Sequence, residues 1–179
     1  MCGSHRYYFM VPFILVMLTR SVDAELRPAQ GWGRVNMQGS IVDTACAIAV
    51  ESRDQTIDME VVPLADIIRD GQGRSKLFTI NLVNCVTERP NKPDWRQFQV
   101  TFDGDAEGEL FSVQGDASGV ALRIIDLAGN IAIPGKPLPF GEISPGNMQL
   151  NYTMKLMANN HALKAGDYFS VIRFKLDYF

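Results

Sequence analysis

The C-terminal end of the chain alternates between apolar and polar side chains. Ile172, Phe174, Leu176 and Tyr178 share one face, and the residues between them, which share the other, are charged. A period of two that is rich in β-branched and aromatic residues predicts a half-buried β-strand, here from Tyr168 to the last residue. Chain ends fray unless something holds them. A terminal strand must therefore pair within its own sheet or with a strand of a partner.

Shorter alternating stretches recur along the chain, separated by polar segments and by segments with glycine and proline. They predict strands at residues 40–50, 76–84, 98–102, 120–126 and 148–156. Residues 61–68 fit either a strand or a single helical turn. Loops or turns are expected at residues 70–73, 88–96, 103–109, 127–130, 133–145 and 159–165. Short strands joined by turns, without a long amphipathic helix, predict an all-β sandwich.

The composition is that of an ordinary globular protein, because 46% of the 179 residues are hydrophobic and 21% are charged. That length suffices for one domain with a sizeable core. A net charge of −3 argues against a nucleic-acid partner, which requires a basic face.

Residues 1–24 predict a cleaved signal peptide. An apolar run from Tyr7 to Leu18 follows a basic start, and Val22 and Ala24 supply the small residues that precede a cut. The run is too short for a typical membrane span, and no later run approaches the ~20 apolar residues that a span requires. The mature chain is thus expected to begin near Glu25, outside the cytoplasm and without a membrane span.

The mature chain keeps two cysteines, Cys46 and Cys85, because Cys2 belongs to the leader. Two cysteines in an exported chain predict one disulfide, and the chain-entropy model assigns about 4 kcal/mol to a loop of this length. Neither a metal nor another cofactor is expected. The cysteines form no CxxC motif, and the acidic residues within 103–109 lack the length and closing glutamate of an EF-hand loop.

Residues 25–39 oppose helix formation through Pro28 and a pair of glycines. The odd positions share one face, which is small at one end and apolar at the other: Ala29, Gly31, Gly33, Val35 and Met37. This pattern fits a flexible tail that leads into the first strand. It also fits a strand donated to a partner, with glycines where the receiving groove is shallow.

Several motifs resemble those of chaperone–usher pilus subunits. Residues 39–46 fit the run G-x-[IV]-V-x-x-x-C of that family, and residues 80–85 fit its I-x-L-x-N-C ending. Residues 55–59 resemble its following short strand. Gly166, the apolar alternation after it and the next-to-last Tyr178 resemble the C-terminal signature. The order and spacing of these motifs extend over essentially the whole mature chain.

The resemblance implies an incomplete immunoglobulin-like β-sandwich of six strands, the seventh supplied in trans. The implied domains are the signal peptide at 1–24, a donor-strand extension at 25–39 and a pilin domain at 40–179. A periplasmic chaperone would first pair with the C-terminal strand; at the outer-membrane usher, the extension of a neighbouring subunit would replace it. The implied chaperone-binding residues are Gly166, Ile172, Phe174, Leu176 and Tyr178, and the implied donor residues are Ala29, Gly31, Gly33, Val35 and Met37.

Within this family, residues 100–104, 129–132 and 165–169 are most similar to minor subunits and to the terminator of P-type pili. The sequence therefore predicts a minor structural subunit, a terminator or an adaptor, that serves pilus assembly and adhesion at the cell surface. A major rod subunit is the alternative.

Two other classes of protein fit the sequence less well than a pilus subunit does. An enzyme of the Ser-His-Asp type would depend on His161 alone, which lies in a polar loop, so no catalysis is expected. A carbohydrate-binding adhesin would usually carry an additional lectin domain, and it would lack the N-terminal extension.

Overall fold

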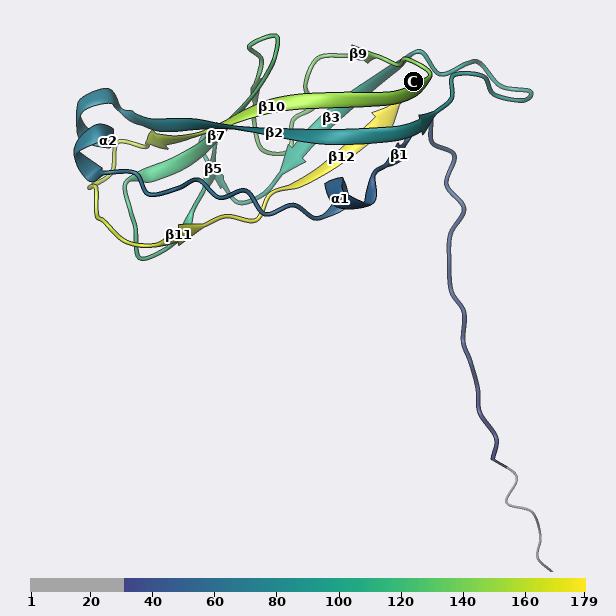
Figure 1. Ribbon diagram of the computed structural model, residues 1–179, viewed down its shortest axis with the longest axis horizontal. Coiled ribbons are helices and arrows are strands. Elements are labelled where there is room, and N and C mark those ends of the chain that lie inside the picture. The colour runs from purple at the N-terminus through teal and green to yellow at the C-terminus, as the bar shows by residue number, and fades with distance from the viewer. Residues whose placement is uncertain (1–30) are drawn as a thin grey trace, which may run out of the picture. The chain divides into compact units, whose positions relative to one another are not determined.

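The computed structural model describes residues 31–179 (Figure 1). The chain divides into an N-terminal unit, Met1–Ser40, and a compact unit, Ile41–Phe179. In the first unit, residues 31–40 are exposed and form neither helix nor strand. The predicted signal peptide and the first part of the extension, including Ala29, lie outside the described residues.

The compact unit is a β-sandwich with one large and one small main sheet. The large sheet has the order β1 (Ala47–Ile48), β2 (Gln72–Cys85), β10 (Gly146–Ala158), β7 (Val120–Asp126), β5 (Leu110–Ser112) and β4 (Ala106–Glu107), and β8 (Ile131–Ala132) also pairs with β7. The small sheet has the order β12 (Arg173–Tyr178), β3 (Gln97–Asp103) and β9 (Gly141–Glu142). A separate pair joins β11 (Tyr168–Phe169) to β6 (Gln114–Gly115). The pairings between these strands are antiparallel.

The core lies between the two main sheets. Phe102 of β3 meets Tyr152 of β10 edge to face, with ring centroids 4.9 Å apart. Ile80, Phe111 and Ile124 are fully buried beside them. The large apolar residues of both sheets form one core, as in other sandwiches.

The predicted strands at 76–84, 98–102, 120–126 and 148–156 are confirmed as β2, β3, β7 and β10. The region at 61–68 that the sequence left open contains a helix, α2 (Leu64–Asp70). Its end is set by Gly71, whose φ of 68° is left-handed and whose N–H donates to the carbonyl of Ile67.

The predicted first strand at 40–50 is largely wrong. Only β1 pairs there, and a four-residue helix, α1 (Val50–Arg53), follows it. Ile41 and Val42 are exposed, whereas Ala45 and Cys46 are both buried, so the strict in-and-out alternation of a strand is broken.

Two further predicted strands differ from the structure. Residues 55–59 form no strand, because their backbone has no hydrogen-bonded neighbour in the part of the chain that the structure describes. The terminal strand is interrupted after β11 and resumes as β12 at Arg173. In the gap, the Ser170 hydroxyl donates to the carbonyl of Ser112 at 2.8 Å, which ties this segment to β5 instead of β3. Within residues 31–179 the chain forms twelve strands, several of them of two residues, instead of six long ones.

Candidate functional site

Within residues 31–179, the terminal strand β12 has one paired and one open edge, because β3 is its one partner there. Phe179 and Gln97 exchange two backbone hydrogen bonds, of 2.8 and 3.1 Å. Bonded and non-bonded pairs alternate along an antiparallel ladder. The N–H and C=O groups of Phe174, Leu176 and Tyr178 therefore point away from β3, toward the open edge.

The same residues turn their side chains toward the core. Ile172, Phe174, Leu176 and Tyr178 are half-buried against it, whereas Lys175 between them is exposed. The alternation predicted for the chain end is thus present from Ile172 onward. β12 offers a partner both an apolar face and free backbone groups.

The second open edge is the segment 54–62, which links α1 to α2. No backbone group of this segment is bonded to another backbone group within the described part of the chain. Its side chains nevertheless alternate, because Ile57 and Met59 are half-buried against the core and Thr56, Asp58 and Glu60 are exposed. The segment has the side-chain pattern of a strand without the hydrogen bonds of one.

Two observations concern residues on or next to the open edges. The Tyr178 hydroxyl of β12 donates to the carbonyl of Cys46, which precedes β1, at 3.4 Å. In β11, burial and the nearby negative charge of Asp58, from the segment 54–62, raise the pKa of Tyr168. The hydroxyl of Tyr168 is itself buried and has no hydrogen-bond partner among residues 31–179. Figure 1 shows the segment between α1 and α2 running beside β11 and β12.

A disulfide joins Cys46 to Cys85, at the end of β2. Both cysteines are buried, and next to them the N–H of Val86 donates to the carbonyl of Ala45 at 2.8 Å. These bonds attach the start of the compact unit to the longest strand of the large sheet.

Gly166, which the sequence assigns to the chaperone-binding strand, lies in a close backbone contact within the domain. A Cβ atom at this position would lie 2.7 Å from the carbonyl carbon of Asp116 and 2.8 Å from the nitrogen of Ala117. Both of those residues donate their N–H groups to the carbonyl of Asp167. Gly115, whose φ is 126°, makes a similarly close backbone contact with Asp167, so a Cβ atom at this position would also clash. We call this contact the glycine seam.

The described residues of the predicted donor strand are open to a partner. Val35 and Met37 are 88% and 91% exposed, and a Cβ atom added at Gly31 or Gly33 would meet nothing within 4 Å. Trp32, on the other face, is equally exposed, so the structure does not distinguish the two faces.

At the end of the domain that holds the disulfide, two positively charged side chains bind the carboxylate of Asp43. Its carboxylate lies 2.7 Å from Lys92 and 2.6 Å from Arg89, and these hydrogen bonds lower its pKa. The Arg89 guanidinium stacks on the Trp95 ring at 3.7 Å, and Trp95 in turn packs on Tyr178 of β12. Sequence reasoning described residues 88–96 only as a surface loop, because no local pattern shows which charges meet.

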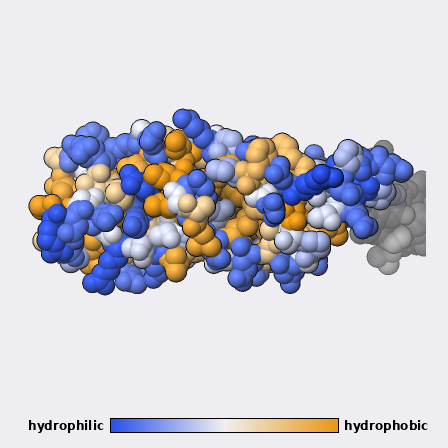
Figure 2. Space-filling view, turned by 90° about the horizontal axis from the view of Figure 1, so that it is seen from above, coloured by the Kyte–Doolittle hydropathy of each residue, from blue (hydrophilic) through white to orange (hydrophobic). Residues whose placement is uncertain are grey.

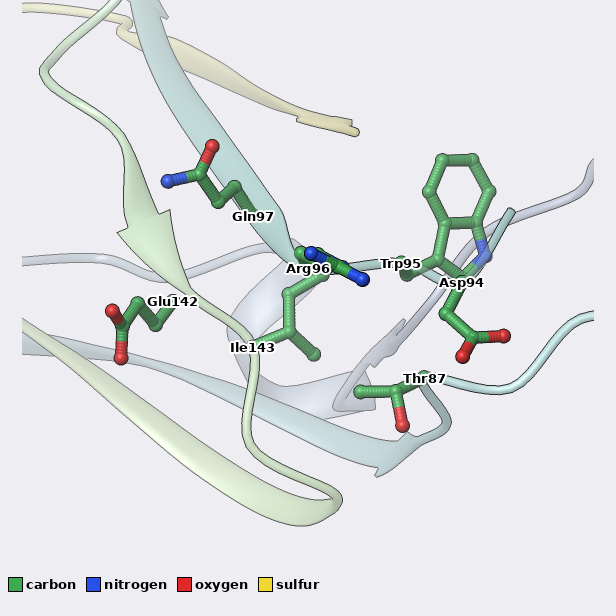
Figure 3. Close-up of a pocket in the computed structure, with 7 residues that line it drawn as sticks. All are labelled: Thr87, Asp94, Trp95, Arg96, Gln97, Glu142 and Ile143. Carbon is green, nitrogen blue, oxygen red and sulfur yellow. The ribbon is translucent and has the colours of Figure 1, made fainter.

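Beside Trp95 lies an open pocket of about 560 Å³, lined by Thr87, Asp94, Trp95, Arg96, Gln97, Glu142 and Ile143. Figure 3 shows Asp94 and Glu142 on opposite sides of it, with Arg96 and Ile143 between them. Figure 2 shows apolar residues interspersed with polar ones on one face of the molecule. Leu127 and Phe140 are among the large apolar residues that are exposed.

The remaining chemistry of the described chain is sparse. Residues 31–179 contain no group of three or more metal-ligating side chains. His161 is mostly exposed and lies 3.0 Å from the carboxylate of Glu107. Among the same residues, no helix has the length and apolar character that crossing a membrane requires.

No protein-family model matches the sequence. The chain is, however, 36% identical over 151 residues to the PAP fimbrial minor pilin protein of Escherichia coli, with 82% of this chain and 77% of that protein covered. The chain belongs to the fimbrial pilin family. The pilin is also 32% identical over 154 residues to the Fimbria A protein of Serratia marcescens, with 83% of its own length and 86% of that protein covered.

The fold of the pilin is that of a chaperone–usher pilus subunit. A subunit in the solved structure of a chaperone–usher pilus superimposes with a TM-score of 0.66 at 24% identity, over 84% of the pilin and 97% of that subunit. The pilin is therefore a structural pilus subunit of the immunoglobulin-like class, exported to the cell surface as part of a fimbria.

Proposed function

We propose that the pilin is a minor subunit of its pilus, completed by a strand that enters between β12 and the segment 54–62. Such a strand would form backbone ladders with both open edges at once, and its inward side chains would cover Phe174 and Leu176. A periplasmic chaperone supplies this strand first. The extension of a neighbouring subunit then replaces it at the outer-membrane usher.

The observation that carries the proposal is the pair of open edges over one apolar face. Buried or half-buried backbone groups are almost always hydrogen-bonded in finished folds. Among residues 31–179, the open edge of β12 and the whole backbone of 54–62 lack backbone partners, while Ile57, Met59 and Phe174 still point inward. One strand from another molecule satisfies both edges.

The extension at residues 25–39 is the strand that the pilin donates in turn. The face of Gly31, Gly33, Val35 and Met37 is the one that enters the receiving subunit, together with Ala29. In support of this role, residues 31–40 are exposed and unpaired within the described chain.

The experiment that tests completion in trans is strand exchange. The purified complex of the pilin with its chaperone is mixed with a donor peptide from another subunit of the same pilus, and chaperone release is followed by native mass spectrometry. Exchange indicates an adaptor or rod position. A complex that keeps its chaperone in the presence of the peptide indicates a terminator. If the pilin is recovered folded and monomeric without any partner strand, the open edges are not an acceptor site.

The minor position is tested separately, by subunit abundance. Relatives named as minor pilins support it. Quantitative mass spectrometry of purified fibres is expected to find far fewer copies of the pilin than of the most abundant subunit. If the pilin is itself that most abundant subunit, it is a rod subunit, and the role of its edges is unaffected.

A further inference from the structure

The end of the compact unit that bears Asp43 and the loop 87–96 forms a polar surface next to the first residues of that unit, which continue the chain from the extension. We infer that this surface docks on the subunit that receives the extension. The inference rests on the proposed function, because it requires that residues 29–37 enter another subunit. We call this surface the root face, and it comprises Lys92, Asp94, Arg96 and Glu142 together with the pocket between them.

The first residues of the compact unit are held at this face. Asp43, two residues after the start of the compact unit, has one carboxylate oxygen within 2.7 Å of both Arg89 and Lys92. The Arg89 side chain is only 17% exposed, because it lies on the Trp95 ring and also donates to the carbonyl of Pro93 at 3.3 Å. The start of the compact unit is therefore tied to the loop 87–96.

The tether to the receiving subunit is short. The last inward residue of the proposed donor strand is Met37, and the chain is fixed again at Asp43. A fully extended chain covers at most 3.3–3.6 Å per residue, so these two points are no more than about 20 Å apart. The end of the receiving site must lie within this distance of the root face.

The chemistry of the root face suits a polar protein surface. Asp94, Arg96 and Glu142 are exposed and form no ion pair within residues 31–179. They surround the open pocket of about 560 Å³ described above, and Trp95 forms one wall (Figure 3). Mixed charges around a half-buried tryptophan are typical of the rim and anchor of a protein–protein contact. The partner is the subunit that is already tethered beside it.

Site-specific photo-cross-linking tests this contact. A photoreactive amino acid replaces Lys92, whose side chain is 56% exposed, in the mature pilin carried by its chaperone. The matched control places the same group at Ile68 on α2, which is 67% exposed and lies at the opposite end of the domain (Figure 1). The pilin is mixed with a chaperone-bound subunit of the same pilus that accepts its extension. We expect an adduct with the accepting subunit from position 92 and none from position 68.

A peptide of residues 25–41 separates the two proposals. If the peptide enters the accepting subunit but position 92 gives no adduct, the docking of the root face is wrong and the donor role stands. If neither the peptide nor the pilin enters any subunit of the pilus, the donor role itself is wrong. In a variant that carries the photoreactive group at the exposed Glu142 instead, Lys92 keeps its contact with Asp43. There, Asp43→Asn should leave insertion intact and lower the adduct yield at position 142. An unchanged yield would overturn the role of the Asp43 clamp.

Discussion

Replacing Gly166 by alanine tests whether this glycine serves the fold or the chaperone. The added Cβ atom would lie 2.7 Å from the backbone carbon of Asp116. An ordinary contact at this position would be about 3.4 Å or longer, so the two backbones of the glycine seam must separate by several tenths of an ångström. Overpacking of this kind costs about 1–3 kcal/mol. For a domain of this size, that is roughly 3–10 °C in apparent Tm.

The assay is thermal unfolding of the purified chaperone complex at fixed concentration, with hydrogen exchange of residues 114–119 as a local readout. Gly73→Ala is the matched control, because its Cβ atom would lie at an ordinary 3.4 Å from Leu156 and Val62. We expect a lower Tm and faster exchange in the glycine seam for Gly166→Ala alone. Equal Tm values for both variants would refute the steric argument. Weaker chaperone binding with unchanged exchange at 114–119 would assign Gly166 to the chaperone.

Three further predictions concern the open edge, the donor strand and the disulfide. Phe174→Glu should abolish recovery of the chaperone complex, because it places a charge in the apolar face at a cost of several kcal/mol. The control Lys175→Glu should leave recovery of the complex unchanged. Normal recovery of Phe174→Glu would contradict the assignment of β12 as an open edge. Gly33→Leu should block incorporation into fibres, because Gly33 lies on the face that is proposed to enter the receiving subunit, whereas Arg34→Leu should be tolerated. Both variants should still form chaperone complexes. Equal incorporation would show that the proposed face is not the one that enters. Mass spectrometry of periplasmic pilin should detect no free thiol, and two free thiols in wild-type material would exclude the disulfide. Replacing both cysteines by serine should lower the yield of the chaperone complex, since the chain-entropy model assigns about 4 kcal/mol to the loop.

The strands that the sequence predicts well are those whose partners are within the same chain. In β7 and β10 the apolar residues alternate because two neighbouring strands and a core impose one face, so pattern and structure agree. Residues 55–59 carry the same kind of pattern and form no strand, because the alternation encodes burial whereas a strand also needs a hydrogen-bonded neighbour. That neighbour is not part of this chain in the proposed assembly.

Some residues of the candidate site are predictable from the sequence, and others are not. Ile172, Phe174 and Leu176 are visible in the sequence as one face, and their half-burial follows it. The contact of Asp43 with Arg89 and Lys92 joins residues more than forty positions apart, and no periodicity marks it. The role of Gly166 was also hidden, since the backbone that it touches belongs to a loop far from it in sequence.

The disulfide has a consequence for how the pilin carries load. In the proposed assembly, tension on a fibre enters the compact unit at Ile41, after the end of the extension. The two-residue strand β1 would be a weak point in its path. The bond from Cys46 to Cys85 bypasses it and transfers tension covalently to the end of β2. β2 is held along most of its length by β10, so the tension is spread over many backbone hydrogen bonds. The junction most exposed to mechanical stress thus depends on a covalent link and on the broadest ladder in the domain.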